Sequence, residues 1–197
     1  MVVAQAAAAR CAGADFRVVH DKNRASGEAG IFLEMIDRNP LIESPAAPDI
    51  AAERWLNTPA ALTVAGLRGR IVALHAFQML CPGCVLHGVP QAQRLHERFD
   101  AGDLQVIGLH SVFEHHAAMG QASLDAFVHE FRISFPVAVD QHEAPDPLPV
   151  TMRRYAMRGT PTLVLIDRAG RIRDHFFGQV DDLAVGVALG RLLAERS

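Results

Sequence analysis

The chain has 197 residues, of which 50% are hydrophobic and 21% are charged, and its formal net charge is −3 at pH 7. This length suits one domain with an extension better than two full domains, and the composition is typical of a globular protein with a sizeable core. This net negative charge argues against the basic surface that nucleic-acid binding requires. No apolar stretch reaches the length of a membrane span. We therefore expect neither a nucleic acid nor a membrane as partner.

The first part of the chain differs in composition from the rest. An Ala-rich start gives way to a polar stretch over residues 21–30, and a Pro-containing turn region follows over residues 44–48. We interpret residues 1–45 as an extension, partly disordered, and residues 46–197 as one domain. The apolar start has no positively charged region and is interrupted by polar residues, so it is a poor secretory signal. The expected location is the cytoplasm.

The domain itself begins with alternating strand and helix patterns. Residues 55–57 and 62–64 predict a short leading β-hairpin, and the near-continuous apolar run over residues 71–77 predicts a buried central strand. A helix follows from about residue 82 to residue 99, with apolar residues at helical spacing along one face. Pro90 lies inside this helix and should kink it, because proline cannot donate a hydrogen bond to the carbonyl four residues back.

The remaining elements continue the alternation. In chain order they are a strand over residues 104–109, a helix over 124–131, a short extended segment over 135–139, two strands over 162–167 and 171–177 joined by a turn at 168–170, and a last helix that Asp181 or Asp182 caps. The order β, α, β, α, β, β, α behind the leading hairpin predicts an α/β fold. Its mixed central sheet should be flanked by helices on both faces.

The cysteines carry the chemistry of this chain. There are three of them, Cys11, Cys81 and Cys84, too few for a disulfide scaffold or a four-cysteine zinc site. Two form a Cys-Pro-Gly-Cys motif between a predicted strand and a predicted helix, which is typical of a redox-active dithiol. Pro82 would occupy the first helical position, and the free backbone N–H groups there favour a thiolate at Cys81. We predict that Cys81 is the nucleophile and that Cys84 resolves the mixed disulfide.

Several segments together resemble a known family. Residues 67–77, the motif at 81–84 and the later Gly-Thr-Pro-Thr at 159–162 are similar to thioredoxin-like proteins, in particular the redoxin (AhpC/TSA) and TlpA-type branch. The likeness covers roughly residues 46–195. It implies the thioredoxin fold and a thiol–disulfide oxidoreductase activity.

The resemblance also assigns roles to residues around the motif. It implies that Pro161 is a cis-proline packed beside the two cysteines, and that Thr160 offers its backbone to the substrate chain. Leu80 and Pro82 flank the first cysteine as further substrate contacts, although family members often carry an aromatic residue in place of Leu80. His75 stands six residues before the first cysteine, where many thioredoxins carry a buried acid. It is either the proton acceptor of the resolving thiol or a core histidine.

Three classes of function follow from these residues. The first is an oxidoreductase that reduces or exchanges protein or small-molecule disulfides, drawing electrons from a thiol-based donor, with no organic cofactor and no metal. The AhpC/TSA likeness suggests an antioxidant thiol peroxidase as the second. Such peroxidases usually place a threonine three residues before the reacting cysteine, where this chain has Gln78. The third is a metal-binding module of the same fold, with Cys81, Cys84 and a histidine as ligands.

Overall fold

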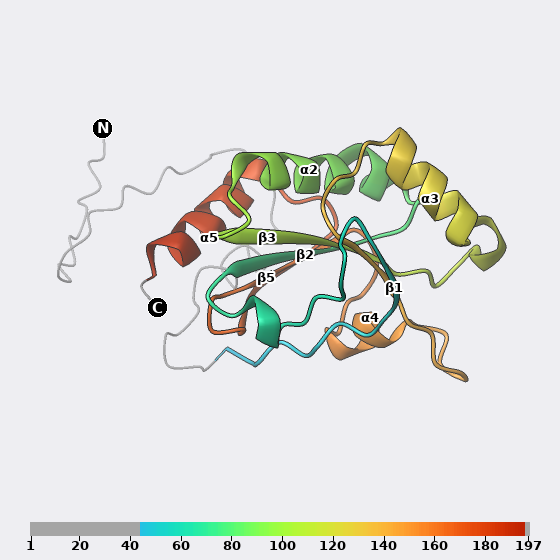
Figure 1. Ribbon diagram of the computed structural model, residues 1–197, viewed down its shortest axis with the longest axis horizontal. Helices are drawn as coiled ribbons and strands as arrows, with labels where there is room; N and C mark the ends of the chain where they lie inside the picture. Colours follow the sequence, from blue (N-terminus) through green and yellow to red (C-terminus); the bar gives the residue numbers. More distant parts are fainter. Residues whose placement is uncertain (1–43, 196–197) are drawn as a thin grey trace, which may run out of the picture. The chain divides into compact units, whose positions relative to one another are not determined.

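The computed structural model describes residues 44–195, which form a mixed six-stranded sheet flanked by helices (Figure 1). The strands, in chain order, are β1 (Ala52–Leu56), β2 (Ile71–Phe77), β3 (Leu104–His110), β4 (Val137–Asp140), β5 (Thr162–Ile166) and β6 (Ile172–Phe177). Their order across the sheet is β1-β4-β3-β2-β5-β6. The pairs β2–β3 and β3–β4 are parallel and the others are antiparallel, so the predicted mixed sheet is confirmed.

Helices cover both faces of this sheet. The helical elements are the 3₁₀ turns Ala65–Leu67 and His116–Ala118, the π-helical turn η2 (Cys84–Gly88), and the α-helices α2 (Val89–Arg98), α3 (Gln121–Glu130), α4 (Val150–Arg154) and α5 (Asp182–Ala194). Figure 1 shows α2, α3 and α5 on one face and the short α4 on the other. In residues 44–195, no helix is both long and apolar enough to cross a membrane. The predicted extension, apart from residues 44 and 45, lies outside the described residues.

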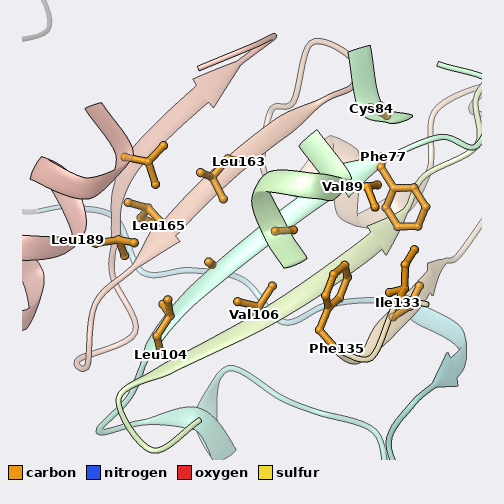
Figure 2. Close-up of a cluster of buried hydrophobic side chains, with 14 of the residues drawn as sticks. Phe77, Cys84, Val89, Leu104, Val106, Ile133, Phe135, Leu163, Leu165 and Leu189 are labelled. Atoms are coloured by element: carbon orange, nitrogen blue, oxygen red, sulfur yellow. The ribbon is translucent and has the colours of Figure 1, made fainter. Parts of the chain in front are cut away.

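The core consists of two apolar layers, one on each side of the sheet. Strand β2 is buried along its whole length, and its side chains alternate between the two layers. Ile71, Ala73 and Phe77 join the layer beneath α2, α3 and α5, part of which is drawn in Figure 2. Val72 and Leu74 join the layer on the α4 side. The same alternation directs His75, between Ala73 and Phe77 in this register, to the α2 side.

The predicted leading hairpin is wrong in its pairing. Strand β1 forms, but it lies at the edge of the sheet and pairs antiparallel with β4, while residues 62–64 form no strand. Asn57 explains why β1 pairs with β4. Its side-chain Nδ2 donates to the carbonyls of Ile133 and Phe135, at 2.7 and 3.1 Å. These two bonds fasten the end of β1 to the segment that enters β4. The chain beyond Asn57 leads away from the sheet and into a 3₁₀ turn.

The predicted helix after the motif forms, with a local change in its hydrogen-bond register. Pro82 is the first helical residue, and the helical run continues to Arg98. Between them η2 is π-helical, and the Val89 N–H donates to the carbonyl of Cys84, five residues back. Pro90 therefore stands in the first turn of α2, where a missing N–H costs little. The π turn lies directly before Pro90, and the kink expected at Pro90 stays a prediction.

Two further predictions are confirmed near the end of the chain. A turn at residues 168–170 joins β5 to β6 in an antiparallel pair. Asp181 caps α5, since its Oδ1 accepts a hydrogen bond of 2.9 Å from the N–H of Leu183. The buried side of α5 includes the predicted Val185 and Leu189.

Candidate active site

The Cys-Pro-Gly-Cys motif lies where β2 ends and the helical run begins, as the sequence predicts. Both cysteines are free thiols, but they differ in exposure: Cys81 is half-buried, whereas Cys84 is fully buried. Figure 2 shows Cys84 at the end of the apolar cluster, close to Phe77 and Val89. A disulfide substrate can therefore reach Cys81 before it reaches Cys84.

The sulfur of Cys81 lies between the start of the helical run and the loop that carries Thr160. The backbone N–H of Cys84 donates to Cys81 Sγ at 3.4 Å, which is the helix-start donor that the sequence predicts. On the other side, Cys81 Sγ is 3.4 Å from the carbonyl oxygen of Thr160. The residue expected to pair with a substrate chain is thus in direct contact with the expected nucleophile.

The thiol of Cys84 is in an environment that opposes its ionisation. Burial, together with a hydrogen bond to Cys81, raises the pKa of Cys84 to about 12. Hydrogen bonds from the Gln78 backbone and the Thr160 side chain lower the pKa of Cys84, but they do not offset the burial. Cys84 is therefore a neutral thiol at pH 7 while Cys81 is reduced. Any attack by Cys84 requires prior loss of its proton.

Pro161 packs directly on the motif. The Thr160–Pro161 peptide bond is cis, as the resemblance implies. A Cβ atom at Gly83 would stand 3.2 Å from Pro161 Cδ, and one at Gly88 would stand 3.0 Å from Pro161 Cβ. These two glycines leave the space that the proline ring occupies beside the helical run. The arrangement joins two segments that lie nearly 80 residues apart in the sequence.

His75 lies beneath the same helical run, with only 2% of its surface exposed. A Cβ atom at Gly88 would overlap with its imidazole, and its Nδ1 has no hydrogen-bond partner. Burial lowers the pKa of His75 to about 4, so the ring is neutral at pH 7. The ring borders a pocket of about 310 Å³ between η2, α2 and the start of α5. Within residues 44–195, no hydrogen bond joins His75 to Cys81 or Cys84, so its role as proton acceptor stays a prediction.

Gln78 is part of the site, although the sequence indicated only its bearing on peroxidase chemistry. Its side chain is 1% exposed. The side-chain Nε2 donates to Thr160 Oγ1 at 3.4 Å, the Oε1 atom is buried without a partner, and the backbone carbonyl accepts from Cys81 N–H at 3.3 Å. The signal in the sequence was a long polar residue directly after a buried strand. Its partner Thr160 is too distant along the chain for a local pattern to reveal.

The surface around Cys81 carries the other predicted contact residues. Leu80 is 56% exposed and Pro82 is exposed, so both are available to a bound chain. Leu86, on η2, is 68% exposed and extends this apolar rim. Among residues 44–195, no group of three or more His, Cys, Asp or Glu side chains is placed to hold a metal ion. The third cysteine of the sequence, Cys11, lies outside the described residues.

Comparison with known proteins identifies the family of the chain. The family model described as AhpC/TSA matches residues 44–175, two thirds of the chain. The chain belongs to the AhpC/TSA family. No curated protein gives a significant match.

Solved structures show the same relationship. A thioredoxin-like superfamily protein is 49% identical, with a TM-score of 0.76, and the match covers 78% of this chain and 99% of that one. A thiol-disulfide isomerase from Corynebacterium glutamicum is also 49% identical, with a TM-score of 0.75 and the same coverage. A thioredoxin-like protein in its oxidized form, 20% identical over 78% of this chain and 98% of that one, has a TM-score of 0.65 and shows the common fold. The thioredoxin fold and the general function of a thioredoxin-like thiol–disulfide oxidoreductase are therefore those of this chain.

Proposed function

We propose that this protein reduces or exchanges protein disulfides with the dithiol Cys81–Cys84. The observation that carries the proposal is the asymmetry of the two sulfurs: Cys81 is accessible at the helix start and contacts Thr160, while Cys84 is buried behind it. The thiolate of Cys81 would attack one sulfur of the substrate disulfide and release the other as a thiolate. Cys84, after losing its proton, would then attack Cys81 Sγ and release the second substrate thiolate.

The products of this sequence are a Cys81–Cys84 disulfide and a reduced substrate, so two electrons pass to the substrate. A thiol-based donor returns the protein to the dithiol form. The exposed side chains of Leu80 and Pro82 offer an apolar surface to the segments that flank a substrate cysteine. The carbonyl of Thr160, beside Cys81 Sγ, is placed to accept a backbone hydrogen bond from such a segment.

The burial of Cys84 makes its proton the main obstacle to the second step. Two of the causes that raise the pKa of Cys84, a hydrogen bond and a charge interaction, come from Cys81. Both are removed when Cys81 is bonded to substrate. His75 is neutral and can accept a proton, but its pKa of about 4 is far below that of Cys84, so direct transfer to His75 is strongly unfavourable.

Thiol peroxidase activity is the second candidate, favoured by the match to the AhpC/TSA family model. In that reaction Cys81 would take an oxygen from the peroxide and become a sulfenic acid, which Cys84 would convert to a disulfide with loss of water. Three residues before the reacting cysteine, where such peroxidases usually carry a threonine hydroxyl, this chain places the side-chain amide of Gln78. This difference favours disulfide exchange as the principal reaction.

Side-by-side turnover of a protein disulfide and a peroxide tests the proposal. Wild type, Cys81→Ser and Cys84→Ser would be compared in a Cys11→Ser background, with insulin and hydrogen peroxide as substrates and dithiothreitol as donor. We expect insulin reduction to be lost in Cys81→Ser, and Cys84→Ser to accumulate a mixed disulfide with the substrate. Insulin reduction that survives Cys81→Ser would overturn the site. Rapid peroxide consumption with negligible insulin reduction would establish the peroxidase instead.

A further inference from the structure

Arg158 adjoins the segment that contacts the nucleophile, and the dithiol mechanism gives it no role. It stands two residues before Thr160, whose carbonyl oxygen is 3.4 Å from Cys81 Sγ. Its side chain is exposed. Within residues 44–195, no carboxylate forms an ion pair with its guanidinium group. A permanent positive charge therefore stands beside the segment at which a substrate chain is expected to bind.

The ring of Phe177 holds this guanidinium group in place. The Cζ atom of Arg158 is 4.9 Å from the centroid of the Phe177 ring, which is a cation–π contact. The same ring fills the space beside Gly159, where a Cβ atom would stand 2.9 Å from Phe177 Cε2. The next residue, Gly178, donates its N–H to the Pro161 carbonyl at 2.8 Å. Arg158 is thus held against the end of β6 that also contacts the cis-proline segment.

Two neighbouring arginines differ from Arg158 in their partners. Arg153 forms ion pairs with two carboxylates, one of them that of Glu143 at 3.2 Å. Arg154 donates to the carbonyl of Asp49 at 3.2 Å. Both guanidinium groups are therefore engaged by the domain itself. The contact of Arg158 with an aromatic ring uses its charge but consumes none of its five N–H donors, so they remain available to a bound molecule.

The exposed side chains that flank the first cysteine are apolar. They are those of Leu80, Pro82 and Leu86. On this surface, a fixed guanidinium group is a strong electrostatic feature for a bound chain. Salt screens such a charge over about 10 Å at 0.1 M ionic strength. The charge therefore acts on residues next to the substrate cysteine and has little effect on distant ones.

We propose that Arg158 is a specificity-determining residue that selects polypeptide disulfides with an aspartate or glutamate within two residues of the reactive cysteine. The proposal rests on the function proposed above, in which the substrate chain pairs with the backbone of Thr160. A chain bound there passes close to Arg158 on one side of its cysteine. The guanidinium group donates charge-assisted hydrogen bonds to the carboxylate, whereas a lysine at the same place is repelled.

Peptide disulfides that differ in one charge test this selection. Symmetric disulfide-linked peptides would carry Glu or Lys two residues before the cysteine in one pair, and two residues after it in another, so that both directions of the bound chain are covered. In a Cys11→Ser background, we expect kcat/KM for the Glu peptide to exceed that for the Lys peptide by about fivefold in at least one pair, the effect of an exposed ion pair. In 0.5 M KCl this ratio should fall below about twofold.

Variants of Arg158 show whether the ratio depends on this side chain. Arg158→Gln should lower the ratio below about twofold, Arg158→Glu should reverse it, and Arg158→Lys should retain a preference for Glu because the charge remains. A general change in activity cancels in the ratio. Arg154→Gln is the matched control, since it removes an exposed arginine that is bonded to Asp49, and it should keep the wild-type ratio. Phe177→Leu should lower the ratio, because the guanidinium group is then no longer held on a ring.

Three results would each overturn the role of Arg158. They are a ratio near one in both wild-type pairs, a ratio that Arg158→Gln leaves unchanged, and a ratio that persists in 0.5 M KCl. The mechanism is checked separately in a single-turnover reaction with 2,2′-dithiodipyridine, a neutral aromatic disulfide. The first phase of released thione measures attack by Cys81, and the second phase measures resolution by Cys84. If the first phase survives Cys81→Ser, the dithiol mechanism itself fails, whatever the peptide ratios show.

Discussion

His75 is packed so closely beneath Gly88 that any side chain at position 88 would overlap with its imidazole. The strand β2 and the turn η2 meet at this point, and the missing side chain of Gly88 is what allows them to meet. Pro161 Cβ lies on the same spot, 3.0 Å from where a Cβ of residue 88 would be. The contact thus connects the predicted proton acceptor, the π-helical turn and the cis-proline.

Gly88→Ala is expected to destabilise the fold, although alanine usually favours a helix. The added methyl must displace His75 or lift η2 from Pro161, and overpacking of this kind costs about 1–3 kcal/mol. Urea unfolding at pH 7 measures the change in free energy. Gly190→Ala on α5 is the matched control, because nothing lies within 4 Å of its Cβ position, and it should gain up to about 1 kcal/mol. Equal effects of the two substitutions would show that the close contact at Gly88 does not exist.

The buried histidines are expected to make the fold acid-sensitive. Burial lowers the pKa of His75 and of His110 from 6.5 to about 4. Between these pH values the unfolded chain binds protons that the folded protein does not, so stability falls as the pH falls. Each histidine accounts for about 3 kcal/mol over this range at 1.36 kcal/mol per pKa unit. Asp140, whose pKa burial raises, acts in the opposite sense.

Substitution of His110 checks this pH dependence, because both ring nitrogens of His110 are buried without a partner. Between pH 7 and pH 4, the unfolding free energy of His110→Leu should fall by about 3 kcal/mol less than that of wild type. The contribution of Asp140 is common to both proteins and cancels in the comparison. His129→Leu, at a side chain that is 85% exposed, should follow the wild-type curve. If His110→Leu also follows the wild-type curve, His110 is charged or solvated in the folded protein.

We expect Asp140 to contribute strongly to folding stability on the α4 side of the sheet. Its carboxylate accepts hydrogen bonds from Ser111 Oγ and from the N–H groups of Thr151 and Met152, at 2.8, 2.8 and 3.0 Å. Asp140→Ala leaves these donors buried and unpaired, which should cost about 3 kcal/mol in unfolding free energy. Asp125→Ala removes an exposed carboxylate from a surface ion pair and should cost less than about 1 kcal/mol. Costs of similar size would show that solvent replaces the missing carboxylate at position 140.

The sequence predicted the parts of the site that depend on local pattern. The apolar run over residues 71–77 forms a buried central strand, and a proline after the first cysteine marks the start of the helical run. The partner of β1 was mispredicted, because the bonds that select β4 come from Asn57 to carbonyls more than 70 residues later. The inclusion of Gln78 in the site was not predicted for the same reason, since it depends on a contact with Thr160, which is distant in the sequence.

Leu80 is expected to contribute to the binding of protein substrates rather than to the chemistry at sulfur. It precedes Cys81 and is 56% exposed, so we expect a substrate chain that reaches Cys81 to contact it. Leu80→Asp should slow insulin reduction several-fold by burying a charge in that contact, at a cost of about 1–2 kcal/mol. It should leave the first phase with a small aromatic disulfide within about twofold. Leu183→Asp, at a leucine of α5 that is 79% exposed and outside the motif, is the control for surface charge. An equal loss with both substrates in Leu80→Asp would show that residue 80 acts on the sulfur itself, and an equal loss in Leu183→Asp would show that charge alone weakens the encounter.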